Sequence, residues 1–164
     1  MQAGTEVSLN PAMVGVAAGE GDVNWDLPKS MQYKEGTEVT ANCSVVNSSS
    51  ATHVYALIFQ VLNKDKNIIY ESLLEFDGYQ AFQLAPNHAL EFSITFSLTR
   101  KDVYVALSLW VCRQSGASWV LDHEVDRVEC FLGTTQLDLS SMMNMMMMVM
   151  VMGMMVPMIS KMGE

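Results

Sequence analysis

The residue types that most often carry chemistry are few in this sequence and lie far apart along it. The histidines are His53, His88 and His123, and none of them is spaced to share a metal ion with a second ligand. No GxSxG, HExxH or glycine-rich phosphate loop occurs. The sequence therefore predicts no catalytic residues, no metal site and no cofactor, and it predicts that the protein is not an enzyme.

The three cysteines form neither a CxxC pair nor a Cys/His cluster, so we expect no structural zinc site. An odd number in so small a set is not typical of a disulfide framework, and free buried thiols are expected for Cys43, Cys112 and Cys130. Strand phase also separates two of them, because Cys112 falls on the face opposite Leu109 and Val111. We therefore predict that no disulfide joins Cys43 to Cys112.

An acidic run, Asp122, Glu124, Asp126 and Glu129, offers oxygen ligands of the kind that Ca²⁺ prefers. It lacks the spacing of a dedicated calcium loop, so a metal site is not predicted there. The whole chain carries a net charge of −9, which argues against binding to a phosphate backbone and against docking on anionic lipid by charge. Nucleic acid is therefore not an expected partner.

Aromatic residues are the main candidates for binding a small ligand. Trp25, Tyr79 and Trp119, together with Trp110, are able to line a sugar-binding face by stacking. The competing interpretation is that Trp110 and Trp119 pack in or near the core, as large aromatic residues usually do. The sequence leaves both interpretations open.

The C-terminal segment is the most unusual part of the chain. Between Met142 and Met162 lie 12 of the 15 methionines, and only Lys161 and Glu164 carry charge beyond position 140. The pattern predicts an apolar helix over 141–156, ending near Pro157, or an apolar tail. The residues expected to form a membrane or assembly anchor are Met142, Met143, Met145, Met146, Met147, Met148, Met150, Met152, Met154, Met155 and Met158.

A segment that is apolar on every side requires lipid, a protein environment or copies of itself around it. A further alternative is Cu(I) binding, because soft thioethers select this ion. Copper motifs usually place methionines among polar residues, however, and this run is nearly continuous. Membrane insertion or burial in an oligomer is therefore the favoured interpretation.

The elements that must position these residues have the pattern of an all-β protein. Apolar residues alternate with polar ones over long stretches from Thr37 to Leu132, separated by turn signals such as Asp77-Gly78. We predict an irregular N-terminal arm (1–36), an antiparallel β-sandwich domain (37–139) and the Met-rich hydrophobic segment (140–164). The residues predicted to be buried in the sandwich are Leu57, Phe59, Val61, Phe92, Ile94, Val105 and Leu107.

From about Glu35 to Leu132 the chain resembles an immunoglobulin-like module, and it is most similar to the CARDB-like adhesion repeats of prokaryotic surface proteins. The segments that carry the resemblance are Gly36–Ala41, Val46–Ser49, Tyr55–Val61, Leu84–Pro86 and Asp102–Val105. The resemblance implies an immunoglobulin-like sandwich in which Tyr104 and Ala106 face inward. Hydrophobicity instead favours Val103, Val105 and Leu107 as the inward face.

The expected function follows from these features. We expect a structural or assembly module, displayed on a membrane, filament or virion and anchored by its tail, with self-association or membrane contact. The alternatives are a carbohydrate- or protein-binding sandwich module and a Cu(I)-handling protein. The first residues have neither a basic region nor an apolar core, so no N-terminal signal peptide is predicted. A membrane, cell-surface or virion location is favoured.

Overall fold

The computed structural model describes residues 1–13, 15, 19–34, 36–98, 100, 102–134 and 147–159, with only the backbone described for residue 134 and for 147–159. All regular structure in these residues is β-strand, which confirms the predicted all-β class. The strands are β1 (Glu6–Val7), β2 (Asp22–Trp25), β3 (Ser30–Tyr33), β4 (Glu38–Val46), β5 (His53–Leu62), β6 (Ile68–Leu73), β7 (Ala81–Leu84), β8 (His88–Leu98), β9 (Val103–Ser115), β10 (Ser118–Thr134) and β11 (Met147–Ile159).

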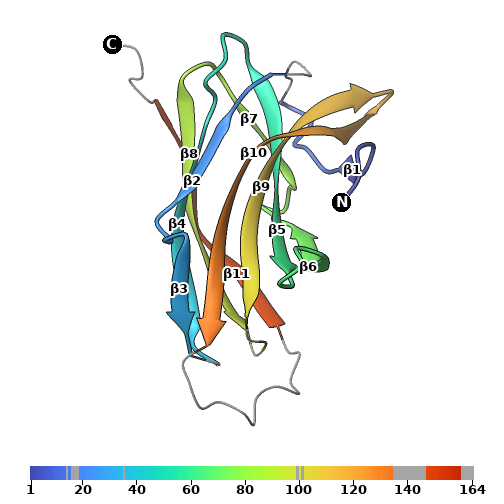
Figure 1. Cartoon of the computed structure of the whole chain (residues 1–164). Helices are drawn as coiled ribbons and strands as arrows, with labels where there is room; N and C mark the ends of the chain where they lie inside the picture. Colours follow the sequence, from blue (N-terminus) through green and yellow to red (C-terminus); the bar gives the residue numbers. More distant parts are fainter. Residues whose placement is uncertain are drawn as a thin grey trace.

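The strands form two sheets that pack face to face (Figure 1). The larger sheet has seven strands, in the order β1-β10-β9-β5-β6, with β3 added beside β10 and β7 beside β5. The smaller sheet has the order β11-β8-β4-β2. The strands of the predicted sandwich domain pair antiparallel with one another, as expected, and the parallel pair joins β10 to β3, which lies in the N-terminal segment.

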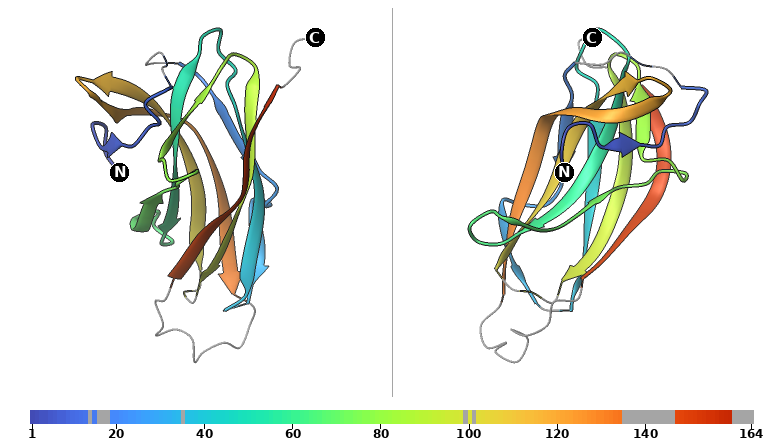
Figure 2. Two further views of the ribbon diagram at one scale, coloured as in Figure 1. Left: turned by 180° about the vertical axis from the view of Figure 1, so that it is seen from behind. Right: turned by 90° about the vertical axis from the view of Figure 1, so that its right-hand side faces the viewer.

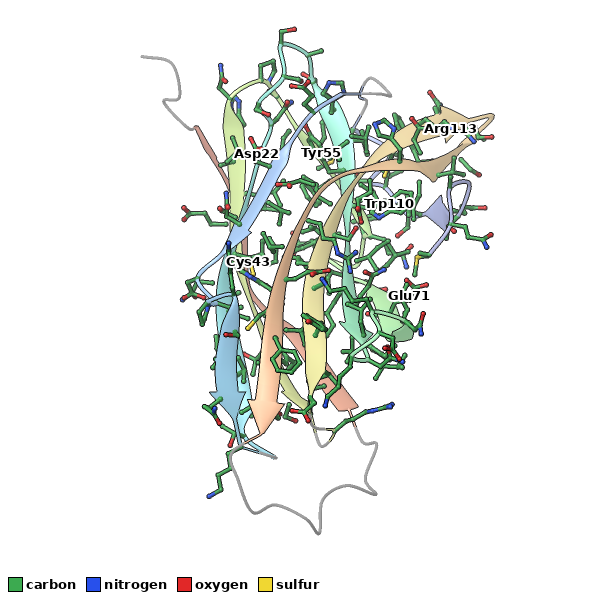
Figure 3. All side chains as sticks on the ribbon, viewed as in Figure 1. Asp22, Cys43, Tyr55, Glu71, Trp110 and Arg113 are labelled. Carbon is green, nitrogen blue, oxygen red and sulfur yellow. The ribbon has the colours of Figure 1, made fainter. Side chains whose placement is uncertain are left out.

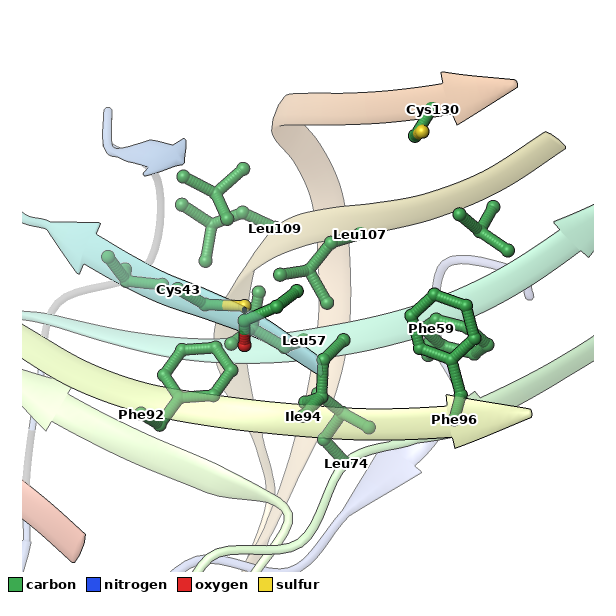
Figure 4. Packing of buried hydrophobic residues seen from close by; sticks show 14 of the residues in the cluster. Cys43, Leu57, Phe59, Leu74, Phe92, Ile94, Phe96, Leu107, Leu109 and Cys130 are labelled. Atoms are coloured by element: carbon green, nitrogen blue, oxygen red, sulfur yellow. Dashed lines mark hydrogen bonds between the residues drawn. The ribbon is translucent and has the colours of Figure 1, made fainter. Parts of the chain in front are cut away.

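The main core lies between the two sheets and is built from residues with period-two spacing. Phe59 of β5 packs against Phe96 of β8, with 5.1 Å between the ring centroids (Figure 4). All seven residues that were predicted to be buried are buried, which confirms the phase of these strands. Val103 also lies in this core, whereas Tyr104 faces outward and packs on Phe131. The immunoglobulin resemblance implied that Tyr104 faces inward, and that expectation is wrong.

A second, smaller apolar cluster covers the outer face of the seven-stranded sheet. It explains why β5 is buried along its whole length: Leu57 and Phe59 face the main core, while Val54, Ala56 and Ile58 face this second cluster. Residues from the N-terminal segment and the β9–β10 hairpin complete the cluster, and the right view of Figure 2 shows the N-terminal segment lying over this side of the sheet.

The segment that was expected to be an irregular arm contributes three short strands, to both sheets. Its small residues are explained by a close approach to β5. A Cβ at Gly19 would lie 2.1 Å from Nε2 of His53, and one at Gly21 would lie 2.8 Å from Cε1 of Tyr55. Tyr55 also donates a hydrogen bond from its hydroxyl to the carbonyl of Glu20, over 2.6 Å. The glycines thus let the backbone lie directly on the end of the sheet.

The described part of the Met-rich segment is a strand, β11, where the sequence predicted an apolar helix or tail. It runs antiparallel to β8 at the edge of the smaller sheet, as both views of Figure 2 show. The backbone groups along the edge of β8 pair with those of β11, which favours a strand over a helix. The β-branched residues Val149, Val151 and Ile159 also favour a strand. Met142, Met143, Met145 and Met146 lie outside the described residues. Among the described residues, no helix has the length and apolar character to cross a membrane.

Candidate functional site

The three predicted binding aromatics lie in three different places. Trp25 lies on β2 opposite Cys43 and packs against the main core. Tyr79 forms an isolated bridge with Phe76 in the connection between β6 and β7. Trp119 lies near the start of β10 and packs against the outer cluster, together with Trp110. These aromatics therefore do not form one stacking face, and the two tryptophans of the outer cluster have the packing role that the competing interpretation gave them.

A hollow of about 590 Å³ opens beside β2, β4 and β8, with both apolar and polar side chains in its lining. We call it the β2–β4–β8 hollow, and it is lined by Asn24, Trp25, Asp26, Asn42, Cys43, Ser44, Glu91, Phe92 and Ser93. The outward residues of β4 and β8 supply its amide, hydroxyl and carboxylate groups. Such groups are able to hydrogen-bond a neutral polar ligand.

Asp26 organises one side of the β2–β4–β8 hollow. Its carboxylate accepts hydrogen bonds from the backbone N–H of Asn42 (2.9 Å) and from Nδ2 of Asn42 (2.8 Å). The backbone N–H of Asp26 donates in turn to the carbonyl of Asn42, over 3.0 Å. These three bonds continue the pairing with β4 beyond Trp25, where β2 ends, and hold the Asn42 amide in one orientation.

A network of charged and polar side chains crosses the outer face of the seven-stranded sheet beside the apolar cluster. Arg127 of β10 donates to Glu129 from Nε (2.8 Å) and to Oε1 of Gln60 from Nη1 (2.7 Å). Gln60 Nε2 then donates to Glu71 (3.1 Å), which also binds the N-terminal ammonium group of Met1 at 2.6 Å. Figure 3 shows Glu71 and Trp110 on this outer side and Cys43 nearer the smaller sheet.

The carboxylates of the acidic run have different partners in the fold. Asp122 lies 3.4 Å from Nε of Arg113, and Asp126 accepts a hydrogen bond from the backbone N–H of Val23 over 2.8 Å. Glu124 accepts from Ser108, and Glu129 binds Lys66 at 2.8 Å as well as Arg127. Register shifts in β10 after Leu121 and after Glu124 break the alternation of the run. In the described part of the chain, no three His, Cys, Asp or Glu residues group as metal ligands.

All three thiols are buried and hold their protons firmly. Burial, and then the charge of Asp26, raise the pKa of Cys43 to about 12. Burial, and then Asp122, raise the pKa of Cys112 to about 12, and burial raises that of Cys130 to about 11. Cys43 of β4 lies in the main core, between the two sheets. Cys112 of β9 lies in the outer cluster, on the other side of the seven-stranded sheet. This placement keeps the two sulfurs apart, as predicted, and a protonated thiol is a poor nucleophile.

The edge of β8 is the feature that links the fold to the unusual tail. Residues Leu98 to Ser93 pair with Met147 to Met152, and Glu91 to His88 pair with Val156 to Ile159. The other edge of β8 is occupied by β4. We call the backbone of His88–Leu98 on the β11 side the β8 edge. Sequence reasoning missed this site, since period-two spacing marks β8 as a strand but does not say which strands lie beside it.

No protein-family model and no curated protein matches the chain. One similar solved structure is the alkylpurine DNA glycosylase AlkC of Pseudomonas fluorescens, bound to DNA containing an abasic site analogue. That match has 11% identity and a TM-score of 0.39, and it covers 70% of this chain and 29% of the other. Another is a family 2 glycosyl hydrolase from Bacteroides cellulosilyticus, with 12% identity and a TM-score of 0.29, covering 79% of this chain and 14% of the other. Similarity at this level carries no argument about activity.

Proposed function

We propose that the protein is a non-enzymatic structural module of a larger assembly, such as a membrane surface, a filament or a virion, and that its C-terminal segment attaches it there. The observation that carries the proposal is β11, whose residues Met147–Ile159 include no charged side chain and which lies on the edge of a sheet. The strands before it already supply both sheets, and β11 adds one edge strand to the smaller of them.

The environment of β11 favours attachment to protein over insertion into lipid. The backbone N–H and C=O groups of a strand need partners outside the strand, and β8 supplies them on one side. Lipid supplies none, and an open sheet edge is costly in a hydrocarbon environment. A protein partner that buries the segment therefore satisfies both its backbone and its apolar composition.

The state of the possible nucleophiles and bases supports a non-enzymatic role. The three thiols have raised pKa values and are buried. His53 is buried near Tyr55, His88 contacts the carbonyl of its own turn at Pro86, and His123 contacts Asp122 on an exposed stretch of β10. The three histidines thus lie in different regions of the fold, and the neighbours named here belong to its core, a turn and a strand.

We also infer that the sandwich is immunoglobulin-like, on the strength of its strand order. The constant-type immunoglobulin fold has sheets ABED and CFG. If β4 and β8 are taken as B and E, and β5, β9 and β10 as C, F and G, the same strands are neighbours here. In this correspondence β11 takes the place beside E that belongs to strand D. The CARDB-like relationship remains a proposal that rests on the sequence resemblance alone.

Size-exclusion chromatography with light scattering on the full chain, with and without detergent, tests the proposed function. We expect the full chain to assemble or to need detergent, and the double variant Met148→Asp with Met152→Asp to shift towards a soluble monomer. A matched control is Gln114→Asp with Ser115→Asp, which adds the same charge at exposed positions at the end of β9, in the other sheet. A full chain that is monomeric and soluble without detergent would contradict the proposal.

Ligand binding at the β2–β4–β8 hollow is a second candidate function. It is favoured by the volume of the hollow and by the fixed Asn42 amide. It lacks the shared aromatic face that was one of the two interpretations of the sequence. Calorimetry with neutral oligosaccharides, comparing the unmodified chain with Asn42→Ala, tests this function; heat that is unchanged in the variant would count against it.

A further inference from the structure

We propose that the β8 edge is a docking site for the C-terminal strand of a second copy of this chain, so that two copies exchange β11 reciprocally. This inference rests on the proposed function and names the partner. The occupant is identified by the structure itself, because the segment paired with the β8 edge is residues Met147–Ile159 of this sequence. An identical segment from a neighbouring copy makes the same backbone bonds.

The β8 edge needs an occupant. Strand β8 is 11 residues long, and the partner strand covers it from His88 to Leu98. Without β11 it would present a row of unpaired N–H and C=O groups, and such an edge readily adds a strand from another chain. Only Glu91, at one position of its outward face, carries a charge that opposes pairing with a new strand.

The position of β11 in the chain keeps the free-energy cost of strand exchange low. Strand β10, which precedes it, belongs to the other sheet, and the 12 residues 135–146 separate the two strands. A chain of this length spans at most about 40 Å when extended. Exchange requires this segment to reach the β8 edge of an adjacent copy in contact with the first. Because β11 makes its contacts with β8, exchange keeps these contacts and costs mainly the entropy of association.

A bulge in β11 fixes which residues of β8 the exchanged strand pairs with. Between Met152 and Val156, three residues of β11 lie opposite the single residue Phe92 of β8. This bulge contains Gly153, and bulges pin a register that a repetitive sequence leaves open. We therefore expect the same residue pairs in the exchanged form, with Thr95 opposite Met150.

Disulfide trapping between differently tagged full-length chains tests the exchange. One chain carries Thr95→Cys and the other Met150→Cys, and the two are co-expressed and mildly oxidised. Register partners in an antiparallel pair have a Cα separation that a disulfide can bridge. The native cysteines are buried, so their background reactivity is low. We expect a disulfide-linked heterodimer that reduction dissolves.

The matched control replaces Met150→Cys with Met158→Cys. Met158 pairs with Ala89, six positions from Thr95, so the two sulfurs lie roughly 20 Å apart and no heterodimer is expected. The double variant T95C/M150C within one chain reports pairing inside a copy. If the full chain assembles but the disulfide forms only within single chains, the exchange is overturned and the proposed function stands. If the full chain is a soluble monomer, both are overturned.

Discussion

Arg127 of β10 reaches Gln60 of β5 across the strand that lies between them: Nη1 of Arg127 and Oε1 of Gln60 are 2.7 Å apart. This contact is possible because β9 places two small residues, Ala106 and Ser108, on the outer face at that point. Ala106 is the register partner of both Gln60 and Glu129, and it is fully buried beneath the longer side chains. A small residue in the middle strand thus allows the outer strands to be joined by side chains.

Removing the guanidinium should destabilise the fold. Gln60 is only 5% exposed, so Arg127→Ala leaves a buried carbonyl oxygen without its donor. We expect the free energy of unfolding to fall by about 1–3 kcal/mol, measured by urea denaturation. The control Arg113→Ala removes an exposed arginine that lies 3.4 Å from Asp122, and such pairs contribute about 0–1 kcal/mol. Equal losses in the two variants would contradict the structural role of the network.

The main core should respond strongly to the loss of one aromatic ring. Phe59 is fully buried and packs against Phe96, so Phe59→Ala removes contacts from both sheets at once. We expect a loss of about 3–5 kcal/mol in the free energy of unfolding. Ile68→Ala, at a residue that is 48% exposed, is the control and should change stability by less than about 0.5 kcal/mol. Similar effects at the two positions would show that Phe59 is not in the core.

Asn47 should be a structural residue of the loop that joins β4 to β5. Its amide donates to the carbonyls of Ala51 and Leu84, each at 2.8 Å, and its oxygen accepts from the backbone N–H of Ser49. The residue is fully buried, so Asn47→Ala leaves backbone groups unsatisfied, at a cost of about 1–3 kcal/mol for each.

Asn63→Ala is the matched control for Asn47. The oxygen of Asn63 also accepts two backbone N–H groups, from Asp65 and Asn67, but it does so in an exposed loop where water can replace it. Thermal unfolding followed by circular dichroism should therefore show a much smaller decrease in Tm for this variant. A larger decrease for Asn63→Ala than for Asn47→Ala would refute the assignment.

Alkaline pH should destabilise the protein through its buried thiols. The pKa of both Cys43 and Cys112 is raised from 9.0 to about 12 in the folded state, so the folded chain keeps protons that the unfolded chain loses. The contribution of these thiols is complete below pH 9.0 and is lost as the pH rises towards about 12.

Urea denaturation at pH values from neutral to about 11 measures this effect. The urea concentration at the midpoint of unfolding should decrease as the pH is raised above 9.0. This decrease should be smaller in the double variant Cys43→Ala with Cys112→Ala. Cys130→Ala should reduce it less, because the pKa of that thiol rises only to about 11. An alkaline decrease of the same size in the double variant would show that other groups are responsible.

Several features of this protein were determined by the sequence alone because they depend on local spacing. Alternation of apolar residues placed Phe59, Phe92 and Val105 on inward faces, and strand phase separated Cys43 from Cys112. Period two follows from the geometry of a single strand, so no knowledge of its neighbours is needed.

Other features were decided by the tertiary structure, because they depend on which strands become neighbours. Local propensity allowed a helix for the methionine segment, but the backbone groups of the β8 edge pair with β11 as a strand. Trp25 and Trp119 were both candidate binding aromatics in the sequence, yet Trp25 packs on the main core and Trp119 on the outer cluster. The contact between Arg127 and Gln60, 67 positions apart, exists only because β9 lies between their strands with a small residue at that point.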